Sequence, residues 1–182
     1  GAVYILFGGN NIGSTGVVAL SALNSVSGVK IHGANSGEQS GFDVNNAGDV
    51  NNDGIVDLII GAPGANTSPG KAYVIFGNST IGANGSLQLS DINGENGLVL
   101  YGASAGDQCG RAVSYAGDPN HDGISDFLIG AHGVDGFTGA TYLVYGKKEI
   151  DLLHQLNLTQ FNSSHGVKFE GASSADFSGY SV

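Results

Sequence analysis

Two acidic nonapeptides have the clearest capacity for chemistry in this chain. They share the form D-x-N-x-D-G-x-x-D and begin at Asp49 and at Asp118. Oxygen ligands at positions 1, 3 and 5 with glycine at position 6 are typical of the opening of an EF-hand-type calcium loop, in which position 7 contributes its backbone carbonyl. The closing carboxylate here stands at position 9. The predicted ligands for at least two Ca²⁺ ions are Asp49, Asn51, Asp53, Ile55 and Asp57 in the first loop and Asp118, Asn120, Asp122, Ile124 and Asp126 in the second.

The same residue types exclude other readings of these loops. Position 12, where an EF-hand carries a bidentate glutamate, is Ile60 or Ile129, so each loop is expected to join two strands and not two helices. The pattern contains no thiol or imidazole, which argues against zinc and copper. Asp, Asn and Gly also favour ordinary turns, but two copies in register favour the metal. Three carboxylates crowded into an empty loop are costly, so calcium is expected to stabilise the fold.

A repeat of 69 residues organises the whole chain. The segment that begins at Gly28 recurs at Gly97 and again at Gly166, with no insertion or deletion between the copies. Four strands are predicted within one unit, at residues 28–33, 41–47, 57–61 and 71–76. A short helical turn capped by Ser21, Ser90 or Thr159 is expected in each connecting segment. The predicted organisation is the tail of a preceding blade at 1–27, complete repeats with a calcium loop at 28–96 and 97–165, and the start of a further blade at 166–182.

These units predict an all-β fold built from β-propeller blades, each a four-stranded antiparallel sheet. The apolar runs at residues 58–60 and 73–76 are typical of strands buried on both faces. Blades cannot bury their faces alone and therefore need neighbours. A partial propeller cut from a longer parent is the favoured interpretation. The alternative is that copies of this chain complete one another's blades, although such a blade would lack its third strand.

Composition restricts the partners. The chain has 16 acidic and 6 basic residues, a formal net charge of −10, and basic residues that form no patch. Nucleic-acid binding is therefore not expected. No apolar run is long enough for a membrane helix, so membrane insertion is not expected either. Cys109 is the only cysteine, which excludes an intrachain disulfide.

The calcium loop, the apolar strand and the following Gly61-Ala-Pro63 resemble the FG-GAP repeats of integrin α-subunit heads. The second copy ends in Gly130-Ala-His132, and the Phe-Gly of the family appears as Ser40-Gly, Cys109-Gly and Ser178-Gly. The resemblance implies a seven-bladed parent, an extracellular or cell-surface location and a role in adhesion. It also implies calcium in the loops on one face and partner-binding loops on the opposite face.

The sequence gives little support for catalytic residues. Gly102-Ala-Ser104-Ala-Gly106 matches a nucleophile elbow, but the elbow needs a following helix, and the equivalents of Ser104 are Asn35 and Ser173. The five histidines lack metal or catalytic spacing, and Cys109 replaces a serine of a repeated turn. No enzymatic activity is expected from this chain.

Three functional hypotheses remain open. The leading one is a non-catalytic extracellular module that binds a protein or glycan. The second is an accessory propeller domain of a secreted hydrolase of the phospholipase D kind, with the catalytic domain outside this chain. The third is a structural repeat array that self-associates through open blade faces.

Overall fold

The structure is a computed structural model of residues 1–182 that describes all of them except 10–12, 14–15, 65–67, 79–82 and 149–154. The described residues are almost entirely strands and turns, as predicted. The strands are β1 (Ala2–Leu6), β2 (Gly28–His32), β3 (Val44–Gly48), β4 (Asp57–Ala62), β5 (Lys71–Ile75), β6 (Ser86–Gln88), β7 (Gly97–Tyr101), β8 (Ala112–Gly117), β9 (Asp126–Ala131), β10 (Ala140–Val144), β11 (Gln155–Asn157) and β12 (Gly166–Glu170). The segment α1 (Val134–Phe137) has positive φ at three of its four residues and is a tight turn.

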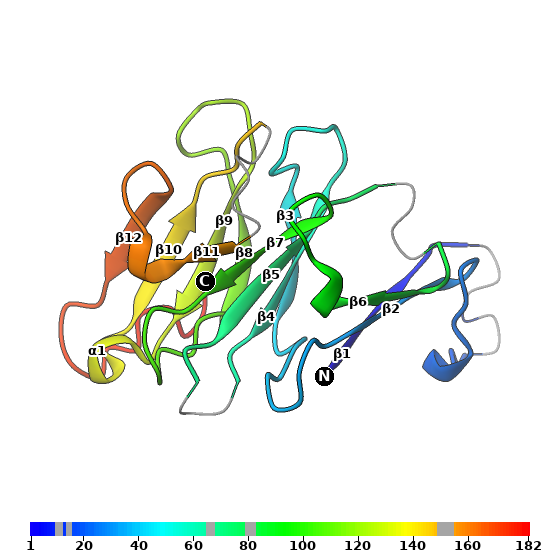
Figure 1. The fold of residues 1–182 in the computed structure, drawn as a ribbon, viewed down its shortest axis with the longest axis horizontal. Coiled ribbons are helices and arrows are strands. Elements are labelled where there is room, and N and C mark those ends of the chain that lie inside the picture. The colour runs from blue at the N-terminus through cyan, green and yellow to red at the C-terminus, as the bar shows by residue number, and fades with distance from the viewer. Residues whose placement is uncertain (10–12, 14–15, 65–67, 79–82, 149–154) are drawn as a thin grey trace.

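The strands form three sheets that lie side by side in Figure 1. Their strand orders are β1-β2-β6, β11-β7-β5-β4-β3 and β12-β10-β9-β8. In the central sheet β3, β4, β5 and β7 pair in antiparallel fashion, and in the C-terminal sheet β8, β9, β10 and β12 do the same. The short strands β6 and β11 lie at an outer edge and pair in parallel with β2 and β7. These are sheets of the blade kind, and the described residues do not close a ring.

The sheets are shifted by one strand relative to the sequence repeat. All four strands expected in the unit 28–96 occur, the second beginning at Val44 and not at residue 41. However, β7, the first strand of the next repeat, pairs with β5, and β12 pairs with β10 in the same way. The central sheet therefore takes β3, β4 and β5 from one repeat and β7 and the short β11 from the next, and the C-terminal sheet takes β8, β9 and β10 from one repeat and β12 from the next. This sharing ties consecutive repeats together by backbone hydrogen bonds.

Apolar side chains fill the two spaces between neighbouring sheets. β5 is buried from Ala72 to Ile75, which agrees with a strand covered on both faces. One core cluster, which includes Ile59, Val74 and Phe127, joins the central and C-terminal sheets. A second cluster, which includes Ile31 and Tyr73, joins the N-terminal and central sheets. Burial of this apolar surface is the main force that holds the blades against one another.

Glycines permit the closest approach between repeats. The N–H of Gly110 donates to the carbonyl oxygen of Gly130 within its own repeat, at 3.0 Å. A Cβ added to Gly61, on β4 of the preceding repeat, would collide with the carbonyl oxygen of Gly110. The glycine of the Gly-Ala-Pro segment is therefore required by the backbone of the next repeat and not by its own backbone angles.

The connecting segments contain the expected short helical turns as 3₁₀ turns at Leu20–Ala22, Leu89–Asp91 and Leu158–Gln160. The predicted caps were wrong, because Ser21, Ser90 and Thr159 lie inside the turns. In the third turn the cap is Asn157, whose side chain accepts the N–H of Thr159 at 2.9 Å. No helix in the described part of the chain is long and apolar enough to cross a membrane.

Candidate metal centre

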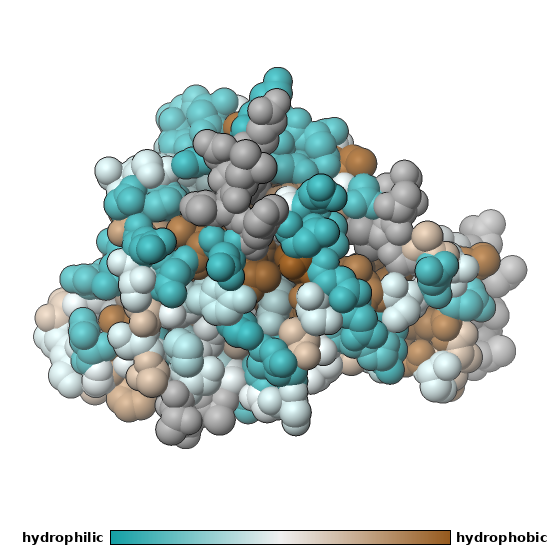
Figure 2. All heavy atoms as spheres, in the orientation of Figure 1, coloured by the Kyte–Doolittle hydropathy of each residue, from teal (hydrophilic) through white to brown (hydrophobic). Residues whose placement is uncertain are grey.

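Both acidic loops lie at the same end of their sheets. The first joins β3 to β4 and the second joins β8 to β9, and they form neighbouring projections at the top of Figure 1. The N–H of Ser125 donates to the carbonyl oxygen of Asp49 at 3.2 Å, and that of Lys147 donates to Val50 at 2.9 Å. Hydrophilic residues gather on this upper end in Figure 2. The fold thus brings two segments 69 residues apart into contact.

The first loop turns its side-chain oxygens toward its own backbone. The carboxylate of Asp49 accepts the N–H groups of Asp53 and Gly54, at 3.0 and 2.8 Å. Asn51 Oδ1 also accepts the N–H of Asp53, at 3.1 Å. Asp53 Oδ1 accepts the N–H of Ile55, at 2.8 Å. The oxygens at positions 1, 3 and 5 therefore all face the interior of one coiled loop.

Asp57 anchors the first loop to the sheet. It is the first residue of β4 and only 2% exposed. Its two oxygens accept the N–H of Val50 at 2.8 Å and that of Gly77 at 2.7 Å. Burial raises the pKa of Asp57 to about 6; the two N–H donors oppose this rise, and the charge of Asp53 adds to it.

The second loop repeats this geometry. Asp118 accepts the N–H groups of Asp122 and Gly123 at 3.1 and 3.0 Å, and Asp122 Oδ1 accepts the N–H of Ile124 at 2.9 Å. Asn120 Oδ1 accepts the N–H of Asp122 at 3.1 Å. The left-handed backbone of Asn52 is matched by that of His121, at φ 58° and 59°. The backbone path is thus the same in both copies.

Asp126 closes the second loop with a different set of partners. It is completely buried, and its Oδ1 accepts the N–H of Gly146 at 2.9 Å. Its Oδ2 has no hydrogen-bond partner among the described residues. Burial raises the pKa of Asp126 to about 6; the backbone N–H groups of Gly146 and, more weakly, Asn120 oppose this rise, and the charges of Asp122 and Asp118 add to it. A buried carboxylate oxygen without a partner favours a positive charge nearby.

The oxygen ligands suit calcium by their chemistry. Among the described residues, no group of three or more Asp, Glu, His or Cys side chains converges on one metal position. A carboxylate offers about four acceptor positions, so an oxygen that accepts one N–H can still bind an ion. A bound ion requires the side chains of each loop to come closer together than they stand here. Ile55 and Ile124 lie in the two loops, as expected. That their backbone carbonyls bind calcium stays a prediction.

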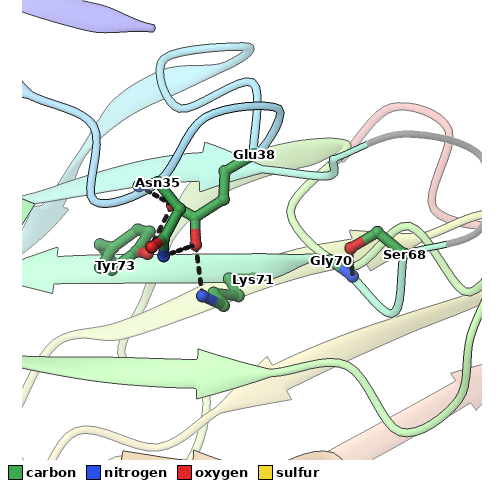
Figure 3. A network of polar contacts seen from close by, with 6 residues as sticks. All are labelled: Asn35, Glu38, Ser68, Gly70, Lys71 and Tyr73. Carbon is green, nitrogen blue, oxygen red and sulfur yellow. Dashed lines mark hydrogen bonds and ion pairs between the residues drawn. The ribbon is translucent and has the colours of Figure 1, made fainter. Parts of the chain in front are cut away.

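A second polar cluster lies at the opposite end of the central sheet (Figure 3). Glu38 forms an ion pair with Lys71 and accepts hydrogen bonds from Asn35 Nδ2 at 2.8 Å and from the Tyr73 hydroxyl at 3.1 Å. Its carboxylate also accepts the N–H of Asn35, at 3.1 Å. Glu38 thereby links the turn between β2 and β3 to β5, a contact that the sequence pattern did not indicate.

The dismissed catalytic candidates occupy structural positions. The N–H of Ser104 donates to the Asp107 carboxylate at 2.8 Å in a turn between β7 and β8. Cys109 is buried, which raises the pKa of its thiol to about 12. His132 is 7% exposed, and its ring centroid lies 5.4 Å from that of Tyr180. None of these three arrangements resembles an activated nucleophile with its base.

Comparison with known proteins supplies the family. The FG-GAP repeat family matches residues 41–75. Phosphatidylinositol-glycan-specific phospholipase D of Bos taurus is 33% identical over 120 residues, which is 61% of this chain and 14% of that protein. Integrin alpha-5 of Xenopus laevis is 30% identical over 165 residues, which is 80% of this chain and 15% of that protein. Integrin alpha-M of Mus musculus is 33% identical over 88 residues, which is 47% of this chain and 7% of that protein.

The chain therefore spans only about a seventh of the length of the first of these relatives. The family match covers the first acidic loop together with β3, β4 and β5. The similarity to integrin alpha-5 covers most of the chain, and the three side-by-side sheets are of the blade kind. The chain belongs to the FG-GAP repeat family and is an integrin-like β-propeller module.

Proposed function

We propose that this chain is a calcium-binding, non-catalytic module of an extracellular or cell-surface protein, and that its blades present loops to a protein or glycan ligand. The observation that carries the proposal is the repeated loop. In both copies three side-chain oxygen groups face one loop interior, and a buried aspartate fastens the loop to the sheet. Two Ca²⁺ ions would change the formal net charge from −10 to −10 + 4 = −6.

The ions would be held by the ten residues already named, from Asp49 to Asp57 and from Asp118 to Asp126. Calcium would supply positive charge at the one end of the blades where six aspartates gather. Because the two loops are in direct backbone contact, an ion in either loop would also strengthen the contact between neighbouring sheets. The proposed role of calcium is therefore structural.

The binding role rests on the family and on the relatives. Integrin alpha-5 and integrin alpha-M support adhesion at the cell surface as the biological setting. The scattered basic residues and the net charge of −10 argue against a nucleic-acid partner. Exposed apolar residues on the outer flanks, among them Phe7 on one side and Phe169 on the other, favour contact with further blades or self-association.

The second candidate function is favoured by the phospholipase relatives. The phospholipase activity in their names makes an accessory propeller of a secreted hydrolase an alternative setting for the same module. A catalytic domain in the same reading frame would support this alternative, and its absence would support the adhesion setting.

Thermal unfolding tests the calcium proposal. A free calcium concentration about 100 times the Kd stabilises the native state by about 3 kcal/mol for each site. For a domain of this size, each occupied site corresponds to a rise in Tm of roughly 6–12 °C. The measurement compares millimolar Ca²⁺ with EGTA, with Mg²⁺ as the ion control and the double variant Asp53→Asn/Asp122→Asn as the site control. A Tm indifferent to calcium would contradict the proposal.

A further inference from the structure

The two acidic loops differ at their second position. In the first loop this residue is Val50, whose N–H donates to Asp57 Oδ2 at 2.8 Å. In the second loop it is Pro119, which has no N–H to donate. The hydrogen bond that completes the closing carboxylate of the first loop therefore cannot form in the second.

The missing N–H of Pro119 affects only one of the two carboxylate oxygens of Asp126. The other oxygen of each closing carboxylate has the same kind of partner, the N–H of Gly77 at 2.7 Å or of Gly146 at 2.9 Å. Both closing aspartates are buried, at 2% and 0% exposure. Asp126 Oδ2 is left without a hydrogen-bond partner of good geometry among the described residues, although the backbone N–H of Asn120 still acts favourably on this carboxylate. The charges of Asp122 and Asp118 act on this carboxylate, which places it beside the other acids of its loop.

The remaining predicted side-chain ligands are matched between the loops. Asn51 Nδ2 donates to Asp53 Oδ2 at 2.9 Å, and Asn120 Nδ2 donates to Asp122 Oδ2 at the same distance. The carboxylates at position 1 accept the same two backbone N–H groups in each copy. The loops therefore form a natural pair that differs at the closing carboxylate.

We propose that the two loops are unequal calcium sites, and that the second binds the ion more tightly because Asp126 Oδ2 is left free for it. This inference rests on the proposed function. A buried charged acceptor without a partner raises the free energy of the ion-free state. A cation bound there removes that cost, whereas in the first loop the Val50 N–H has already removed it. We expect the Kd of the second loop to be about tenfold lower than that of the first.

Calcium titration of the whole 182-residue chain by isothermal calorimetry tests the inference. The wild type is expected to show two sites that differ about tenfold in Kd. Asp53→Asn should leave the tighter site and Asp122→Asn the weaker one, which assigns each Kd to its loop.

Pro119→Val restores the missing N–H and should weaken the second site until the two Kd values approach one another. Pro119→Ala restores the same N–H without the valine side chain and should weaken the second site to the same extent, and neither variant should change the Kd of the first loop. If Pro119→Val fails to fold, the comparison of the two single-site variants decides the question alone.

The outcomes separate the two proposals. Two sites of equal Kd in the wild type, or a tighter site that survives in Asp122→Asn, would overturn the inequality and leave the calcium-binding function standing. An unchanged second site in folded Pro119→Val would overturn the role of the free oxygen. Absence of any calcium binding would overturn the proposed function itself.

Discussion

The two ends of the blades are held together in different ways. At the end with the acidic loops, aspartate side chains accept backbone N–H groups, and one buried oxygen lacks a partner. At the opposite end, backbone packs on backbone at Gly61 and Gly110, and Glu38 pairs with Lys71. Two buried side-chain atoms at this end, Ser40 Oγ and His132 Nδ1, also lack a hydrogen-bond partner among the described residues. The comparison teaches that both ends bury polar atoms without a partner, but those of the second end belong to a serine and a histidine, whereas the first end retains concentrated negative charge that a cation could balance.

Among the expected effects on stability, substitution at the Gly61–Gly110 contact should be the largest. Gly61→Ala places a Cβ against the carbonyl oxygen of Gly110, so the two sheets must separate locally. We expect a loss of about 3 kcal/mol in the free energy of unfolding, measured by urea denaturation. The loss should be equal with calcium and with EGTA, because the collision lies far from the loops.

Gly8→Ala is the matched control for this substitution. A Cβ at Gly8 would meet nothing within 4 Å, so stability should stay nearly unchanged. A Gly61→Ala variant as stable as the Gly8→Ala control would show that the sheets do not depend on this close contact.

An arginine stacked between two rings gives an intermediate effect. Arg111 lies over the rings of Phe42 and Tyr180, with its Cζ atom 4.4 and 4.1 Å from their centroids. These three residues occupy equivalent positions in consecutive repeats, 69 residues apart. Arg111→Leu should cost about 1–2 kcal/mol of unfolding free energy, since both cation–π contacts are lost.

A double-mutant cycle with Phe42→Ala isolates one of these contacts. Coupling between the two substitutions supports a link between repeats at this end. Strictly additive losses would mean that the stacked arrangement contributes nothing beyond the separate side chains.

The Glu38 cluster should give the smallest effect and a pH dependence. Burial by itself raises the pKa of Glu38, but the bonds from Lys71, Asn35 and Tyr73 together outweigh it, so the folded-state pKa lies below the ordinary value of 4.5. The stabilisation is therefore present above pH 4.5 and is lost as the pH falls through the folded-state pKa. Glu38→Gln should cost about 0.5–1 kcal/mol at pH 7, after allowance for solvent screening.

Urea denaturation at pH 7 and pH 3 measures this effect as a difference between wild type and variant. The other carboxylates titrate equally in both proteins and cancel in that difference. The cost should shrink at pH 3, and a cost independent of pH would show that the charge of Glu38 does not stabilise the fold.

Regular spacing made much of the fold predictable. A 69-residue period with glycine at the turns and apolar runs between them predicts strands, because backbone pairing and side-chain burial follow local pattern. The position of every strand from β2 to β5 was anticipated within three residues. The spacing of Asp49, Asn51 and Asp53 likewise predicted a loop with inward oxygens, since Gly54 can adopt the left-handed backbone that the coil requires.

Sequence alone determined the repeat, the strands and the chemistry of the loops, since these depend on residues close together along the chain. Only the tertiary structure decided which strands share a sheet, because pairing of β5 with β7 crosses the boundary of the repeat. It also decided that the two loops touch and that Asp126 is buried without the hydrogen bond that Asp57 receives. Pro119 was visible in the sequence throughout, but its missing N–H matters only where folding buries the carboxylate that would have accepted it.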